Sequence, residues 1–113
     1  MLLFSALAGA AHAGDAARGK ELYDSRCGGC HSIDANRVGP AHRGVFGRKS
    51  GAVRDYDYSP AVRAAGIVWD ARALDRWLAD PERAIPGQRM NYSVSEPVDR
   101  ADLIAFLREQ SKR

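Results

Sequence analysis

The pentapeptide CGGCH, from Cys27 to His31, holds the residue types that can do chemistry. Two thiols at this spacing, followed at once by an imidazole, can form a redox disulfide, contribute to a zinc site or attach haem. A disulfide oxidoreductase places the pair at a helix start in a strand–helix–strand context, and no strand pattern precedes Cys27. Structural zinc needs four ligands, whereas the chain has 2 cysteines and, besides His31, only His12 and His42. A plain structural disulfide stays open as an alternative, but it gives His31 no role.

Haem attachment explains all three residues. The thiols of Cys27 and Cys30 would add to the two vinyl groups of haem, and His31 would then bind the iron through one ring nitrogen. Covalent attachment also prevents loss of the cofactor from the small core of a 113-residue chain. We therefore expect one haem c, attached at Cys27 and Cys30, with His31 as an iron ligand.

The second face of the iron decides the function, because an open face favours gas or peroxide chemistry and a filled face favours electron transfer. Apart from Met1, Met90 is the only methionine, and it lies in the loop IPGQRM, where core filling does not explain a thioether. Met90 is therefore the expected second ligand, and His42 is the competitor. Ligation by His31 and Met90 predicts a low-spin electron carrier and not an enzyme.

Three helices and a long loop must position these residues. The residue patterns predict helices at about 15–26, at about 70–80 and from 95–97 to the C-terminus. Residues 32–69 contain many glycines and prolines and no strand pattern, so a long functional loop is expected there. A small all-helical shell with long loops is typical of a protein wrapped around a large flat cofactor.

The first 13 residues differ in character from the rest. Residues 2–11 are mostly apolar, AHA at 11–13 fits a cleavage site, and none of the 13 is Asp, Glu, Lys or Arg. We expect a cleaved signal peptide at 1–13, one domain at 14–113 and a periplasmic location; a retained N-terminal helix is the alternative. No other segment has the length of a membrane span. The net charge of +3 comes from scattered cations, which speaks against nucleic-acid binding and suits weak docking to acidic protein partners.

The chain resembles the class I, mitochondrial-type cytochromes c, and in particular their bacterial periplasmic members. The resemblance covers the chain from Gly14 onward and rests on five segments in the family order: GKELYDSRCGGCHS, VGPAHRGVFGRKSG, YDYSPAVRAAGIVW, LADPERAIPGQRM and RADLIAFL. It implies an all-α fold in which the N- and C-terminal helices cross, and a soluble monomer that shuttles single electrons between respiratory-type partners. The implied partners are a cytochrome bc-type complex, an oxidase or a periplasmic dehydrogenase, which would bind through a weak docking patch.

The same resemblance implies roles for further residues. Pro40 matches the proline whose carbonyl accepts the second ring N–H of the iron-binding histidine. Residues that match the donors to a buried haem propionate are Arg48, Tyr58 and Trp69. Residues that match the crossing of the terminal helices are Gly19 and Tyr23, with Leu103 and Phe106 opposite.

Some positions depart from the family pattern. His42 stands where a haem-packing leucine usually lies, and Trp77 replaces a tyrosine that approaches the methionine sulfur. Val62 and Gln88 also replace polar residues of the network near the methionine. These departures keep open a rival function, an enzyme or sensor with a labile sixth iron site. Four arginines lie near the expected docking edge, where Glu82 carries a charge of the opposite sign. They are Arg26, Arg37, Arg83 and Arg89.

Overall fold

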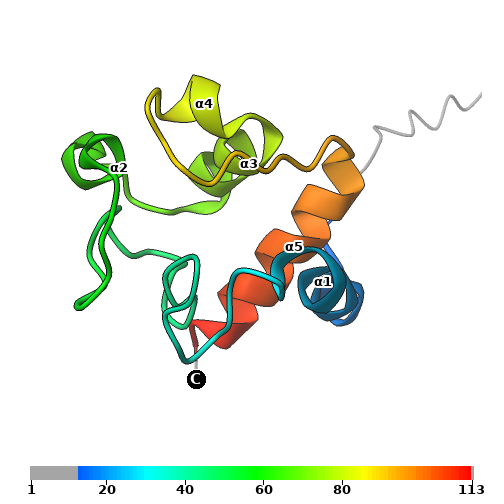
Figure 1. Cartoon of the computed structure of the whole chain (residues 1–113). Coiled ribbons are helices and arrows are strands. Elements are labelled where there is room, and N and C mark those ends of the chain that lie inside the picture. Colours follow the sequence, from blue (N-terminus) through cyan, green and yellow to red (C-terminus); the bar gives the residue numbers. More distant parts are fainter. Residues whose placement is uncertain (1–12, 113) are drawn as a thin grey trace, which may run out of the picture.

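The computed structural model describes residues 13–112, and within them every regular element is a helix (Figure 1). An isolated antiparallel bridge between Lys49 and Val68 is the only β pairing in this part of the chain. The all-α expectation is therefore confirmed. The elements are α1 (Ala16–Leu22), the π-helix η1 (Tyr23–Cys27), α2 (Pro60–Ala65), α3 (Ala71–Ala79), α4 (Pro81–Ala84) and α5 (Pro97–Gln110). No helix among the described residues is both long enough and apolar enough to cross a membrane.

The first predicted helix corresponds to α1 and η1 together. Asp15 begins it, because its carboxylate accepts hydrogen bonds from the backbone N–H groups of Ala17 and Arg18 at 3.0 and 3.1 Å. The last turn widens into a π-helix, in which the Gly28 N–H donates to the Tyr23 carbonyl at 2.8 Å. This widened turn ends at Cys27, so the first thiol lies where the helix passes into the CGGCH loop.

The predicted loop at 32–69 contains one helix that the sequence analysis did not predict. Helix α2 is capped by Ser59, whose hydroxyl accepts from the Val62 N–H at 3.1 Å, and it begins with Pro60. It ends at Gly66 in the left-handed region, with φ 66°. These are local start and stop signals, but the six-residue helix is too short for a clear apolar repeat.

The predicted helix at 70–80 forms as α3 and is followed at once by a second, short helix. Asp70 caps α3 by accepting from the Ala73 N–H at 2.8 Å. The sequence analysis did not predict this second helix, α4. Asp80 accepts from the Arg83 N–H at 3.2 Å, and Pro81 takes the first position of α4.

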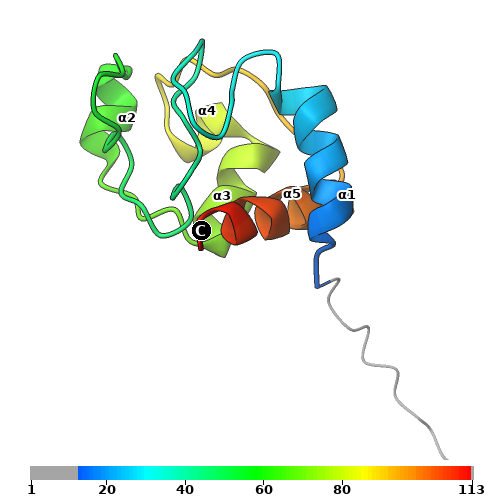
Figure 2. The same ribbon diagram turned by 90° about the horizontal axis from the view of Figure 1, so that it is seen from below.

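Helices α1 and α5 lie side by side where they cross (Figures 1 and 2). Gly19 of α1 lies at this contact. A Cβ atom at Gly19 would lie 2.0 Å from the Asp102 carbonyl oxygen and 2.9 Å from the Phe106 Cβ atom. The fully buried Asp102 carboxylate also accepts from the Asp15 backbone N–H at 2.7 Å and from an Arg18 Nη1 at 2.6 Å. The crossing is therefore held by backbone contact and by a charged hydrogen-bond group.

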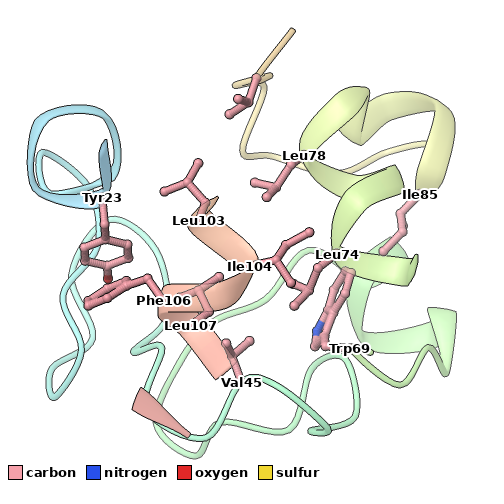
Figure 3. Packing of buried hydrophobic residues seen from close by; sticks show 11 residues of the cluster. Tyr23, Val45, Trp69, Leu74, Leu78, Ile85, Leu103, Ile104, Phe106 and Leu107 are labelled. Carbon is pink, nitrogen blue, oxygen red and sulfur yellow. The ribbon is translucent and has the colours of Figure 1, made fainter. Parts of the chain in front are cut away.

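The apolar core gathers along α5 (Figure 3). On one side the Tyr23 ring packs against the Phe106 ring, with centroids 5.2 Å apart. On the other side lie Leu74 of α3 and the Trp69 ring, next to Ile104. The buried members of the core are Tyr23, Val45, Trp69, Leu74, Leu78, Ile85, Val94, Leu103, Ile104, Phe106 and Leu107.

Replacing Gly19 with alanine tests the crossing. Helix propensity alone would make alanine the more stable residue by up to about 1 kcal/mol. The steric conflict with Asp102 should reverse that sign, and we expect the free energy of unfolding to fall by about 2 kcal/mol. Guanidinium titration followed by far-ultraviolet circular dichroism measures the change, and a stabilised variant would contradict the close approach.

Candidate functional site

The CGGCH loop begins at the end of η1 and closes on itself. The backbone N–H groups of Cys30 and His31 both donate to the Cys27 carbonyl, at 3.1 and 2.9 Å. Both cysteines carry free thiols, with Cys27 half-buried and Cys30 exposed. Burial raises the pKa of the Cys27 thiol to about 11, so it is protonated at neutral pH. Cys27 and Cys30 are not paired with each other among the described residues.

Arg37 holds this loop from outside. Its guanidinium donates to the carbonyls of Gly28, Gly29 and His31, the latter two at 3.2 Å. Sequence analysis placed Arg37 only on a docking edge, because one sequence does not reveal which carbonyls a distant arginine reaches. Its structural role is to satisfy three backbone acceptors of the CGGCH loop.

The His31 ring is oriented by a carbonyl of the following loop. His31 is only 9% exposed, and its Nδ1 atom lies 3.0 Å from the Pro40 carbonyl oxygen. Because a carbonyl only accepts, Nδ1 carries the hydrogen and Nε2 keeps its lone pair. Burial lowers the pKa of His31, and although the Pro40 contact opposes this shift, the ring is neutral at pH 7. Nε2 has no hydrogen-bond partner among the described residues, so it is available to a metal ion.

Gly39 is a residue of this site that the sequence analysis did not single out. A Cβ atom at Gly39 would lie 2.0 Å from Cε1 and 2.5 Å from both nitrogens of the His31 ring. The Gly39 N–H also donates to the Cys30 carbonyl at 2.9 Å. Glycine is therefore required for the chain to pass directly beside the His31 ring.

His42 lies against the same ring. The two imidazoles stack with centroids 4.0 Å apart and an angle of 20° between their planes. The His42 Nδ1 atom is 2.9 Å from the Tyr23 hydroxyl. Burial lowers the pKa of His42 well below its ordinary value, and His31 and Arg48 lower it further. A ring packed face to face with His31 is not placed to act on the opposite side of a metal bound by His31, which argues against His42 as the competing ligand.

Arg48 carries a buried donor that protein atoms leave unsatisfied. Its Nη2 donates to the Ala41 carbonyl at 3.0 Å and its Nη1 to the Arg43 carbonyl at 3.2 Å, but Nε has no partner among the described residues. Burial lowers the pKa of Arg48. A buried guanidinium N–H without an acceptor suits an anionic group such as a carboxylate. Nearby in sequence, the buried Tyr58 hydroxyl accepts from the Val53 N–H at 3.0 Å.

Met90 lies in a second group of residues, which follows α4. The chain on both sides of Met90 is held by Gln88, which is 6% exposed. Its Oε1 accepts from the Asn91 N–H at 2.8 Å, and its Nε2 donates to Asn91 Oδ1 at 2.6 Å and to Glu82 Oε2 at 2.9 Å. Glu82 also accepts from the Gly87 N–H at 2.9 Å. Met90 itself is half-buried.

The two tryptophans lie against each other at the core. The Trp69 and Trp77 rings have centroids 5.5 Å apart and are tilted by 59°. Trp69 is buried in the core and Trp77 is half-buried against it. The sequence-predicted residues are thus divided between a His31 group, which includes Pro40 and His42, and the loop that carries Met90, while Trp77 packs against Trp69 at the core.

Comparison with known proteins identifies relatives along nearly the whole chain. The family model described as cytochrome c matches residues 16–111. A cytochrome c of Arabidopsis thaliana is 42% identical over 103 residues, which are 88% of this chain and 92% of that protein. A cytochrome c of Euglena viridis is 44% identical over 98 residues, which are 84% of this chain and 96% of that protein. Among solved structures, cytochrome cH from Methylobacterium extorquens matches with a TM-score of 0.81 and 39% identity, over 85% of this chain and 99% of that one.

The close contact at Gly39 generates a prediction. Alanine at this position should push the His31 ring out of place and lower the free energy of unfolding by about 2 kcal/mol, because the new Cβ atom needs the space of three ring atoms. Guanidinium titration of the purified protein measures the effect. Gly29→Ala is the matched control, since a Cβ atom there meets nothing within 4 Å. Equal stability of the two variants would contradict the assigned contact.

Proposed function

We propose, because this chain belongs to the cytochrome c family, that His31 and Met90 are the axial ligands of its haem iron. The family membership makes the chain an electron carrier with covalently attached haem c, and the spacing of Cys27, Cys30 and His31 is consistent with that attachment. The observation that carries the proposal is the hydrogen bond from His31 Nδ1 to the Pro40 carbonyl, which leaves Nε2 as a free donor of a lone pair.

The residues present fit a haem. Cys27 and Cys30 are free thiols at the spacing that two vinyl groups require. The Nε of Arg48, which has no partner within residues 13–112, supplies a buried N–H for a propionate, which needs paired donors inside a protein. Tyr58 and Trp69 are buried and carry further polar hydrogens for the same group. We assign these three residues to the propionate site.

The haem, when attached, supplies the one-electron chemistry, and the chain's own residues set the conditions. Pro40 fixes the tautomer of His31 and makes its Nε2 atom a stronger donor. Gln88, through Glu82 and Asn91, holds the loop that would present the Met90 thioether. A thioether favours the ferrous state, so Met90 would raise the reduction potential.

We further propose an exported monomer with a single domain at 14–113. The predicted signal peptide at 1–13 lies, except for Ala13, outside the described residues, and the periplasmic location rests on the apolar run at 2–11 and the AHA sequence after it. Close packing of Gly14 supports the domain start, because a Cβ atom there would lie 2.6 Å from the Ala101 carbonyl oxygen of α5.

The family implies redox proteins as partners, and we propose a bc-type complex, an oxidase or a periplasmic dehydrogenase among them. The docking charge would come mainly from Arg83 and Arg89, which are exposed. Arg89 also lies 3.9 Å from the carboxylate of Asp57, an exposed pair that water screens. Arg26 and Arg37 are engaged elsewhere, since Arg26 donates to the Tyr92 hydroxyl at 2.8 Å and Arg37 holds the CGGCH loop. Such a patch is small and suits weak, short-lived complexes.

The absorption spectrum with a redox titration tests the ligand assignment. The purified ferric protein should be low-spin and show a methionine–iron charge-transfer band. Met90→Leu, which preserves bulk but removes sulfur, should abolish that band, raise the high-spin fraction and lower the reduction potential. An unchanged potential would show that Met90 is not a ligand. A high-spin wild-type protein that binds carbon monoxide rapidly would favour a sensor or peroxidase instead.

The buried cation next to the proposed propionate site gives a second test. Arg48→Met should lower the reduction potential, by an amount on the order of tens of millivolts, because loss of a nearby positive charge stabilises the ferric form. Arg43→Met is the matched control, since Arg43 is exposed and paired with Asp34. Equal shifts in the two variants would contradict the assignment of Arg48 to the haem.

A further inference from the structure

We propose that His42 is a positioning residue, which fixes the plane of the His31 ring by face-to-face contact and is itself anchored by Tyr23. The inference rests on the proposed function of His31 as an iron ligand. It assigns to His42 a role that differs from that of a leucine, which would fill the same volume without offering a flat face or a polar atom.

The contact between the two imidazoles restrains a motion that the Pro40 hydrogen bond leaves free. A single hydrogen bond at Nδ1 fixes one point of the His31 ring, but it still permits the ring to turn about the line from nitrogen to carbonyl oxygen. The His42 ring lies 4.0 Å away and within 20° of parallel, so such a turn would drive ring atoms of His31 into the face of His42. Together the two contacts fix both the direction and the plane of the His31 ring.

The backbone at Gly39 also restricts the His31 ring. Gly39 passes so near that a Cβ atom would lie 2.0 Å from Cε1 of the ring. His31 is therefore enclosed by the Pro40 carbonyl, the Gly39 backbone and the His42 ring. Of these three, His42 is the only side chain, and a substitution can remove it without changing the course of the backbone.

His42 in turn is held by the crossing of the terminal helices. The Tyr23 hydroxyl lies 2.9 Å from its Nδ1 atom, and the Tyr23 ring meets the His42 ring edge-on, at 5.6 Å between centroids and 69° between planes. Tyr23 is 4% exposed and packs against Phe106 of α5. The anchor of His42 is therefore part of the rigid core, and the plane of the His31 ring is linked through two side chains to the α1–α5 crossing.

The plane of an axial imidazole governs the distribution of the unpaired electron in a low-spin ferric haem. That distribution is read directly by the g-values in electron paramagnetic resonance and by the paramagnetic NMR shifts of the haem methyl groups. Both readouts report orientation, and neither depends on a partner protein or on turnover. They separate a positioning role from a contribution to stability alone.

The experiment compares four variants of the haem-loaded protein. His42→Leu should shift the largest g-value and the haem methyl resonances, and should broaden the g-value distribution, because the flat face is lost. His42→Phe, which keeps a flat ring, should restore values near those of the wild type. Tyr23→Phe, which removes only the anchoring hydroxyl, should shift them in the direction of His42→Leu. Ser25→Ala is the control for loss of a hydroxyl in the same π-helix and should leave them unchanged, since the exposed Ser25 hydroxyl donates to the Leu22 carbonyl at 3.2 Å.

Two results would overturn the positioning role. One is a His42→Leu protein with wild-type g-values and methyl shifts, and the other is a His42→Phe protein as strongly shifted as His42→Leu. In either case a low-spin wild-type protein with its charge-transfer band would leave the proposed function intact. Failure of the proposed function is distinct, because it would appear in the wild type as absent haem or a high-spin iron. If His42→Leu does not fold, the Tyr23→Phe variant becomes the test of the positioning role. Wild-type g-values and haem methyl shifts in that variant would contradict the proposal.

Discussion

The close approach of two backbones at Gly19 is the constraint on which the rest of the structure depends. Where α1 meets α5, the Asp102 carbonyl occupies the space that any side chain at Gly19 would need. Asp102 strengthens this contact from the other helix, because its buried carboxylate accepts hydrogen bonds from the start of α1 and from Arg18. Burial of a carboxylate is favourable only with such partners, so the charged group and the glycine specify one register between the two helices.

The register of this crossing determines where the CGGCH loop begins. Tyr23 follows Gly19 by one helical turn, packs on Phe106 and reaches His42 with its hydroxyl. The π-turn that starts at Tyr23 ends at Cys27, and the loop carrying His31 leaves from there. A contact between two helices is thus connected, through a few packed rings and one widened turn, to the residue that we propose as an iron ligand.

Local signals in the sequence predicted much of this arrangement. A cap residue and an apolar repeat were enough for α3, and the apolar repeat after Pro97 was enough for α5, which has no side-chain cap. The C-x-x-C-H spacing was enough to indicate haem. Helices α2 and α4 were missed because six and four residues are too short for an apolar repeat, although each begins with a capping residue and a proline. The positions of Arg37, Gly39 and His42 around the loop could not be predicted, because each depends on how the segment at 32–48 folds back on CGGCH.

The two proposed ligands are held by interactions of different kinds. His31 is enclosed by the Pro40 carbonyl, the Gly39 backbone and a stacked ring, and the last two are packing contacts rather than hydrogen bonds. The Met90 loop is held instead by side-chain hydrogen bonds of Gln88, one of which ends on the exposed Glu82. Hydrogen bonds to an exposed partner compete with water and contribute less net stability than the same bonds in the interior. The His31 side is therefore the more rigid of the two, and changes of the iron's ligation would begin on the Met90 side.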